Sequence, residues 1–292
     1  MKLVRNIVIA GMLALTSSNL SGFDGEQKSD RTQEVKKTER LEELVKKYEG
    51  FIEKATDDNK ALYSYYELKF DNSDNINSKE VEDFSLLLGK YQKLENFEYT
   101  GYYISKLIGS SEDKEFTINT KHLKSLINHL GHENNGKIIT INGNAGNNVG
   151  CIMKKGTINI NGNAGHHVGL SMEDGLIIVK GNVGNWLGND MENGKIIING
   201  NAGNQVGFYM KNGTITVKGN AGSWVGDYMK NGKITINGNA GLYFGHNMVG
   251  GIVNINGDYE SLAGNIKGGN IYHKGKLIVE NGRQRWNQLE NK

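Results

Sequence analysis

Short runs of alternating hydrophobic and polar residues fill the C-terminal half of the chain. Branched aliphatic residues recur there in pairs separated by one polar residue, as in Ile158/Ile160 and Ile234/Ile236. A period of two with β-branched side chains is typical of half-buried β-strands. In the N-terminal part the apolar residues recur instead at steps of three and four, which predicts α-helices. We therefore expect a helical region followed by a β-domain.

The helical region begins with a charged segment, residues 27–68, that carries one apolar stripe. A second helix is predicted to begin at Ser78, where Glu80 and Glu82 precede an apolar run, and residues 71–78 form a polar loop before it. We expect the stripe of the first segment to be a packing face rather than a ligand site. The stripe consists of Leu41, Leu44, Val45, Tyr48, Phe51 and Ile52.

A third helix is predicted over residues 119–130, directly before the strands. Leu123, Leu126, Ile127 and Leu130 would share one side of this helix. A solenoid leaves an open apolar end that has to be covered. We therefore expect this helix to be the N-terminal cap of the β-domain.

Glycine recurs every 19 residues, and four glycine columns and one methionine column keep this step over six or seven repeats. The unit G-x-I-x-I-x-G-N-A-G-x-x-V-G-x-x-M-x-x is too short for a strand with a crossover helix, and four glycines would destabilise a helix. We therefore predict a mainly-β fold in which residues 136–281 form a parallel β-helix of about seven 19-residue coils. The first glycine column is Gly143, Gly162, Gly181, Gly200, Gly219, Gly238 and Gly257.

Each column of the repeat has an expected place in the coil. The Ile/Val pairs, the valine column and the methionines should point inward and fill a narrow core. The asparagines should form a stacked ladder that satisfies backbone groups of neighbouring coils. Metal binding by this ladder is disfavoured, because neutral amides without carboxylates are poor cation ligands. The ladder is Asn144, Asn163, Asn182, Asn201, Asn220 and Asn239.

Composition and charge narrow the classes of partner. The net charge is only +2, so the chain has no electrostatic signature of a nucleic-acid-binding protein. The single cysteine, Cys151, forms neither an internal disulfide nor a zinc motif. Proline is absent and 40 residues are glycine, most of them in the repeats. We therefore expect no nucleic-acid partner and no cofactor.

The N-terminus has the order of a secretory signal. Lys2 and Arg5 precede an apolar run, residues 7–15, and a small polar stretch, residues 16–22. This order predicts an exported or envelope-associated protein, and the alternative is a cytoplasmic protein whose N-terminal segment packs inside. The predicted division of the chain is a signal peptide at 1–22, a helical region with the N-terminal cap at 23–135, the β-helix at 136–281, and a C-terminal cap or tail at 282–292.

The stretch INGNAGNNVGCIMKKGTININGNAG and its successors resemble the GXGXG family. This family includes the C-terminal β-helix domain of the glutamate synthase large subunit and the β-helix subunit of formylmethanofuran dehydrogenase. The resemblance covers residues 137–258 and implies a right-handed β-helix that holds neighbouring catalytic domains or subunits in place. It transfers no catalytic residue to this chain. The helical region and the signal-like N-terminus do not resemble either enzyme.

Candidate chemical groups are few. His166 and His167 lie at one corner of a coil without a carboxylate or cysteine companion, so a surface role is favoured over a metal site. His129 and His132, followed by Glu133, make only half of a metal motif. Gly222-Ser223-Trp224 does not have the spacing of a nucleophile elbow, and the glycine turns lack the lysine and helix of a phosphate loop. We therefore expect no catalytic activity from the chain by itself.

One surface feature stands out, which is a group of aromatic residues at outward positions of the repeat. Residues 19 apart should stack along one face, so Trp224 should lie beside Tyr243 and Tyr209 beside Tyr228. Exposed aromatic residues mark docking or sugar-stacking surfaces, although the rings could also simply fold over the solenoid wall. The predicted docking face is Trp186, Trp224, Tyr243, Phe208, Tyr209 and Tyr228.

Three functions fit these observations. The first is a noncatalytic scaffold or protein-interaction module. The second is a structural accessory subunit of an oxidoreductase complex of the glutamate synthase or formylmethanofuran dehydrogenase type, in which other chains supply all redox chemistry. The third is a surface glycan-binding protein. The oligomeric state and the identity of the partner do not follow from the sequence.

Overall fold

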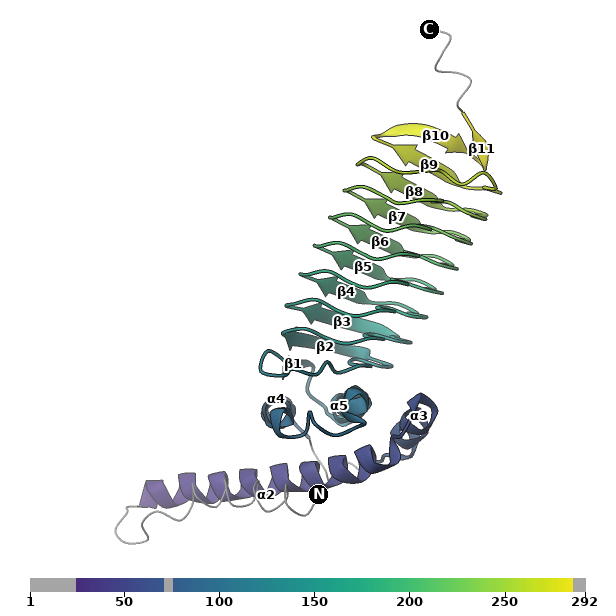
Figure 1. Ribbon diagram of the computed structural model, residues 1–292. Coiled ribbons are helices and arrows are strands. Elements are labelled where there is room, and N and C mark those ends of the chain that lie inside the picture. Colours follow the sequence, from purple (N-terminus) through teal and green to yellow (C-terminus); the bar gives the residue numbers. More distant parts are fainter. Residues whose placement is uncertain (1–24, 71–75, 286–292) are drawn as a thin grey trace.

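The chain folds into a bundle of helices placed at one end of a long β-solenoid (Figure 1). The structure is a computed structural model that describes residues 25–70 and 76–285, with side chains described from residue 37 onwards. The predicted signal peptide, residues 1–22, lies outside the described residues. Within the described part of the chain, no helix has the length and apolar character needed to cross a membrane.

The helical region contains more helices than the sequence pattern distinguishes. Its elements are α2 (Gly25–Lys54), α3 (Asp58–Glu67), α4 (Ser78–Leu87), η1 (Leu88–Lys90), η2 (Phe97–Tyr99) and α5 (Thr100–Ser110). The charged segment 27–68 is divided at Asp57, whose side chain accepts a hydrogen bond from the Lys60 N–H and caps α3. The predicted stripe on α2 is confirmed as a packing face, because Leu44 and Tyr48 are fully buried.

Helix α4 begins where its sequence pattern predicts a start. Its N-cap is Asn77, one residue before the predicted Ser78. The Asn77 side chain accepts from the Glu80 N–H, and the Glu80 carboxylate accepts from the Asn77 N–H, which together form a capping box. This cap positions Phe84 and Leu88 in the core of the helical region.

The solenoid is one sheet of eleven strands in chain order, and its first nine strands pair in parallel. Aligned residues of successive strands are 19 apart through the middle of the stack, so Ile177 pairs with Ile196 and Ile196 with Ile215. This register confirms the predicted parallel β-solenoid. The parallel strands are β1 (Glu115–Asn119), β2 (Asn135–Asn142), β3 (Lys155–Ile160), β4 (Leu176–Val179), β5 (Lys195–Ile198), β6 (Thr214–Val217), β7 (Lys233–Ile236), β8 (Ile252–Ile255) and β9 (Asn270–His273).

The far end of the solenoid is closed by an antiparallel turn-back. Strand β10 (Lys276–Glu280) pairs antiparallel with β9, and β11 (Arg283–Gln284) pairs antiparallel with β10. The reversal ends the parallel stacking that a further coil would continue. Residues 286–292 of the predicted C-terminal cap, with Trp286 and Leu289, lie outside the described residues.

The predicted capping helix at residues 119–130 is wrong, because this stretch is the first coil of the solenoid. Residues 115–119 form β1, and 120–134 are not helical. His129 and Gly131 already have the left-handed backbone of the later corners, with φ of 62° and 72°. Ile127 and Leu130 are buried because they occupy inward positions of the coil. The solenoid therefore begins before the predicted boundary at residue 136.

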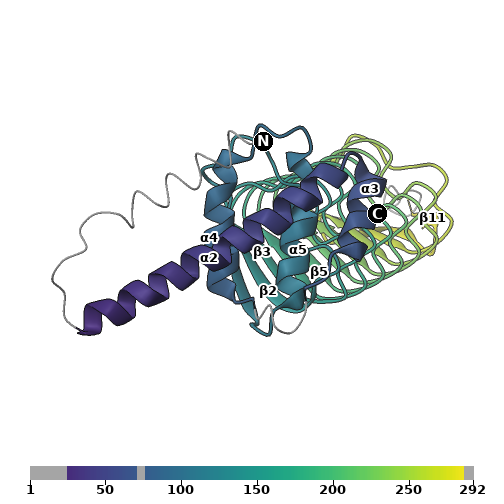
Figure 2. The same ribbon diagram turned by 90° about the horizontal axis from the view of Figure 1, so that it is seen from below.

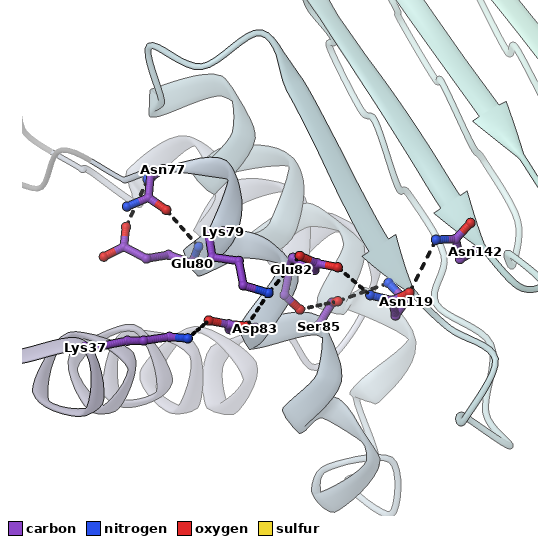
Figure 3. A network of polar contacts seen from close by, with 9 residues as sticks. All are labelled: Lys37, Asn77, Lys79, Glu80, Glu82, Asp83, Ser85, Asn119 and Asn142. Atoms are coloured by element: carbon purple, nitrogen blue, oxygen red, sulfur yellow. Dashed lines mark hydrogen bonds and ion pairs between the residues drawn. The ribbon is translucent and has the colours of Figure 1, made fainter. Parts of the chain in front are cut away.

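Helix α4 covers the free edge of β1 instead of the predicted helix (Figure 3). The Asn119 N–H donates to Ser85 Oγ at 3.0 Å, and Asn119 Oδ1 accepts from Asn142 Nδ2 at 3.4 Å. On the other side of α4, Asp83 binds Lys37 at 2.8 Å and thereby ties α4 to α2. An exposed strand edge invites pairing with other chains, so this contact protects the edge.

The interior of the solenoid is filled by the predicted columns. All valine-column and methionine-column side chains are buried, and most have no exposed surface. This confirms that the period-two strands and the two apolar columns face inward. The inward columns are Val149, Val168, Leu187, Val206, Val225 and Phe244, and Met153, Met172, Met191, Met210, Met229 and Met248.

Candidate functional site: the aromatic corner

The asparagine ladder runs along one edge of the solenoid, as predicted. The Oδ1 atom of Asn144 accepts the backbone N–H of Asn163 at 2.9 Å, and the same bond recurs in each following coil. The last member, Asn239, accepts the N–H of Asp258 at 2.9 Å. The asparagines therefore serve the stacking of the coils.

A second ladder, which the repeat pattern does not reveal, runs along a neighbouring corner. It begins with Asn128 Oδ1, which accepts the N–H of Asn147 at 2.8 Å, and includes His166, whose Nδ1 accepts the N–H of Asn185 at 2.9 Å. Its residues differ in type, so no single letter marks the column in the sequence. The ladder consists of Asn128, Asn147, His166, Asn185, Asn204 and Ser223.

The two corner histidines have structural contacts. Because His166 Nδ1 accepts a backbone N–H, its neutral ring carries the proton on Nε2 and has no lone pair left for a metal ion. His167 stacks on Trp186, with ring centroids 4.8 Å apart and an interplanar angle of 4°. Among the described residues, no group of three His, Cys, Asp or Glu side chains could hold a metal ion.

Two outward columns of the corner have left-handed backbone in every regular coil. One contains His167, Trp186, Gln205, Trp224 and Tyr243, with φ between 58° and 66°. The other contains Ser171, Asp190, Tyr209, Tyr228 and Asn247, with φ between 49° and 54°. The corner geometry requires this conformation, which asparagine and glycine adopt most easily. Bulky aromatic residues occupy it mainly in the C-terminal coils.

Six rings of these coils form one continuous surface, which we name the aromatic corner. Tyr209 stacks on Tyr228 at 4.8 Å, and Trp224 lies against Tyr243 at 5.0 Å. His246 joins the two pairs, because its ring lies 4.8 Å from Trp224 and 6.0 Å from Tyr228. The aromatic corner consists of Phe208, Tyr209, Trp224, Tyr228, Tyr243 and His246.

The structure separates Trp186 from the other five predicted residues. Its ring contacts are with His166 and His167 of the preceding coil, and Gln205 stands between Trp186 and Trp224 in the column. His246 takes the sixth place in the surface. The 19-residue register could have indicated His246, because it places this residue one coil after Asp227 and next to the aromatic columns.

The base of the aromatic corner is a carboxylate–imidazole pair in which the carboxylate is buried and the ring is partly exposed. Asp227 is 4% exposed, and its Oδ1 lies 2.8 Å from His246 Nδ1. Burial raises the pKa of the Asp227 carboxyl, and the hydrogen bond from His246 opposes this shift. The pair fixes the His246 ring against Trp224. The neighbouring serines, Ser223 and Ser261, accept backbone N–H groups, so they are engaged in coil stacking.

The outer part of the corner is exposed and apolar. Tyr209 and Tyr243 are 40% and 46% exposed, and Leu242 and Val249 in the last regular coil are 39% and 54% exposed. At the border, Lys211 forms ion pairs with Asp190 at 3.2 Å and Glu192 at 2.9 Å. This arrangement can offer ring edges and apolar surface to a ligand, with little net charge.

Comparison with solved structures finds a similar chain in the formyltransferase/hydrolase complex of Methylorubrum extorquens, whose crystal structure contains methylofuran. The two chains are 25% identical, the match covers 43% of this chain and 57% of that chain, and the TM-score is 0.37. This chain thus spans less than two thirds of the length of that relative. No curated protein matches the sequence.

Comparison with protein families finds a match over the solenoid. The GXGXG motif family matches residues 117–281, which is more than half of the 292 residues. The matched region begins within β1 and ends after β10, so it coincides with the solenoid, including the first coil, for which the sequence pattern predicts a helix. The chain therefore belongs to the GXGXG motif family.

Proposed function

We propose that the chain is a noncatalytic β-helix scaffold that binds a protein partner through the aromatic corner. The observation that carries this proposal is the placement of large rings at left-handed backbone positions. Tyr209, Trp224, Tyr228 and Tyr243 all have φ between 54° and 66°. Their side chains lie on the outside of the coils and contribute nothing to the buried core.

The energetic cost of the left-handed backbone argues that these rings do not serve folding alone. The left-handed conformation costs an L-residue roughly 1–2 kcal/mol, and four aromatic residues adopt it here. A ring pair contributes about 1 kcal/mol beyond its burial, and Tyr209–Tyr228 and Trp224–Tyr243 make two such pairs. Other coils have smaller or polar residues in the first of the two outward columns, such as Asn148 and Gln205, and asparagine tolerates this backbone at lower cost. Binding of a partner is therefore the better explanation of the rings.

Ring orientation favours a protein over a glycan. Tyr209 and Tyr228 use one face each against the other, at an interplanar angle of 25°, and His246 meets Trp224 edge-on at 86°. A sugar ring binds flat on a free aromatic face, whereas a protein interface takes up exposed edges and the apolar grooves between rings. Tyrosine and tryptophan are also the residue types that dominate protein–protein hot spots.

Membership in the GXGXG motif family makes a more specific version worth testing, in which the partner is a catalytic chain of an oxidoreductase complex. The resemblance to glutamate synthase and to the β-helix subunit of formylmethanofuran dehydrogenase motivates this version. Companion chains purified with the protein from its own cells would decide it. Flavin or iron–sulfur chains in fixed ratio would support it, and their absence would leave the general scaffold proposal.

The test compares two matched aromatic changes. Trp224→Asn with Tyr243→Asn removes one half of the aromatic corner, and Trp186→Asn changes the same column outside it. Asparagine suits the left-handed backbone at all three positions, so all variants should fold. The full-length tagged protein and both variants are purified from the native cells, and the partner recovered with each is quantified by mass spectrometry.

We expect at least tenfold less partner to be recovered with the double variant than with the unchanged protein. The reason is that each hot-spot aromatic residue contributes about 2 kcal/mol or more to the binding free energy. The Trp186→Asn variant should retain it. Equal recovery with the double variant and the unchanged protein would refute the proposed docking surface. Binding of a glycan array that depends on Trp224, without a protein partner, would replace the proposal with the glycan-binding alternative.

A further inference from the structure

Two histidines of the first coil are buried against the helical region. Figure 2 shows helices α3 and α5 lying across the N-terminal end of the solenoid. His132 is 3% exposed, and its ring meets Tyr65 of α3 and Tyr102 of α5 edge-on at 5.1 and 4.9 Å. His129 is 4% exposed and stacks on Tyr102 at 4.1 Å. We name the group of His129, His132, Tyr65 and Tyr102 the histidine seam.

The His132 ring is buried without any polar partner. Neither Nδ1 nor Nε2 has a hydrogen bond, and neither atom is reached by solvent. His129 differs, because its Nε2 lies 3.2 Å from Asp58 Oδ1, although its Nδ1 is also unpaired. A neutral imidazole tolerates such an enclosure at moderate cost, but a protonated one would be a buried charge without a counter-ion in contact.

The same seam holds α3 to the solenoid through few polar contacts. The hydroxyls of Tyr65 and Tyr66 donate to the two oxygens of Glu133 at 3.2 and 3.1 Å. Asp58, at the start of α3, contacts His129. The His132 ring lies against Tyr65 of α3, beside these contacts. A change that makes this ring solvent-exposed therefore requires α3 to separate from the first coil.

We propose that the histidine seam is an acid-sensitive latch, in which protonation of His132 releases α3 from the solenoid while the coils stay folded. The latch would act in mildly acidic surroundings and would uncover Tyr102 and the segment of the first coil from His129 to Glu133. It is independent of the aromatic corner, which lies on later coils.

The charged groups around His132 do not cancel the effect of burial. Burial lowers the pKa of His132 to about 4, Glu133 opposes the shift, and His129 and Lys154 add to it. Burial also lowers the pKa of His129, and Asp58 opposes that shift. On α3 and α5 the His132 ring meets Tyr65 and Tyr102, and the charged group of α5 nearest to these rings is Lys106, whose Nζ lies 4.7 Å from the Tyr65 ring centroid.

The direction of the pH effect follows from the shift of His132. In the open state the ring is solvated, and its pKa returns to the ordinary 6.5. The open state therefore binds more protons between pH 6.5 and about 4, so the closed state is weakened as the pH falls through this window and is unaffected above it. Between pH 7 and pH 5, linkage predicts that the equilibrium constant for docking of α3 on the first coil falls about twentyfold.

Hydrogen exchange of the full chain tests the latch. Amide protection is measured at pH 7 and pH 5 by mass spectrometry and corrected for the intrinsic pH dependence of exchange. We expect the protection of α3 peptides to fall about tenfold or more at pH 5, with β5 and β6 unchanged. Unchanged protection of α3, or an equal loss in β5 and β6, would overturn the proposal.

Variants identify the group responsible. His132→Phe keeps an aromatic ring in the enclosure without a titrating nitrogen, and His132→Gln is a smaller neutral replacement in case phenylalanine does not fit. Either should abolish the pH-dependent loss of protection in α3. His122→Gln, at an exposed position of the same coil, should keep it. Persistence of the loss in both His132 variants would assign it to another group and contradict the latch.

Discussion

The helical region and the solenoid are stabilised in opposite ways. In the helical region, each core contact occurs once, as in the edge contacts of Tyr48 with Phe84 at 5.4 Å and with Tyr103 at 5.3 Å. In the solenoid, the same contact recurs every 19 residues, as the Ile177–Ile196–Ile215 column does. A repeated contact spreads stability over neighbouring coils, whereas a unique contact concentrates it. Damage should therefore be global in the helical region and local in the solenoid.

Within the solenoid, positions that stack the coils can be told apart from positions that are available for binding. The positions of the first asparagine ladder keep one residue type, and the second ladder keeps a side chain that accepts a backbone N–H in each coil. The column of Gln205, Trp224 and Tyr243 keeps neither, so its side chains are free of that requirement. The aromatic corner lies at such variable positions, so its residues can be changed while the stack is preserved.

The largest expected effect is in the helical region. Phe84 has no exposed surface and contacts Tyr48 and Tyr103. Phe84→Ala should lower the free energy of unfolding of this region by about 3–5 kcal/mol, because it leaves a large cavity. Urea unfolding followed by far-UV circular dichroism measures the change. Leu86→Ala, at a 50% exposed position of the same helix, should cost less than about 0.5 kcal/mol.

A corner glycine of the solenoid should matter less and more locally. Gly207 has φ of 72°, and an added Cβ would lie 2.4 Å from Ile234 Cδ1. Gly207→Ala should cost about 2 kcal/mol from backbone strain and overpacking, with faster hydrogen exchange only in the adjacent coils. Gly264→Ala is the control, because an added Cβ there meets no atom within 4 Å. Equal losses in both variants would contradict the packing argument.

A ladder asparagine should have a smaller effect. Asn201 Oδ1 accepts the N–H of Asn220 at 2.8 Å. Asn201→Ala should cost about 1 kcal/mol, which is the usual contribution of one hydrogen bond. Asn212→Ala, an exposed position of the same coil, should be within about 0.5 kcal/mol of the unchanged protein. Thermal unfolding of the two variants side by side makes the comparison, and a neutral Asn201→Ala would show that the ladder does not stabilise the stack.

The smallest effect is expected at the aromatic corner itself. Trp224→Asn relieves a bulky residue from φ of 66° and loses the contact with Tyr243. These changes oppose each other, so stability should change by no more than about 0.5 kcal/mol. A loss above about 2 kcal/mol in a melting experiment would mean that the ring has a folding role, and this would weaken the argument for docking.

Regular repetition decided which parts of the structure could be predicted from the sequence. The 19-residue step placed Val206, Met210 and Asn201 correctly, because each repeats in aligned coils. The first coil was missed because it keeps only one of the four glycines, Gly131, and because Leu123, Ile127 and Leu130 happen to have helical spacing. Asn128, Leu130 and Gly131, each 19 residues before its counterpart in the next coil, mark it as a coil in the sequence.

The candidate site was predicted in part for the same reason. The register placed Trp224 beside Tyr243 and Tyr209 beside Tyr228. It could not join these pairs, because the ring of His246 connects them across columns and its orientation depends on the buried Asp227. The histidine seam was also beyond the sequence, since His132 meets Tyr65 only through the packing of α3 on the first coil.

Site-specific photo-crosslinking tests the central claim most directly. A photoreactive phenylalanine analogue replaces Tyr243 in the aromatic corner, or Thr235 on the strand face of β7 as the control, in the full-length protein in its own cells. Docking through the aromatic corner predicts a discrete protein adduct from position 243 that disappears in the Trp224→Asn background, and none from position 235. Absence of a protein adduct at position 243, or the same adduct from both positions, would contradict docking through this surface.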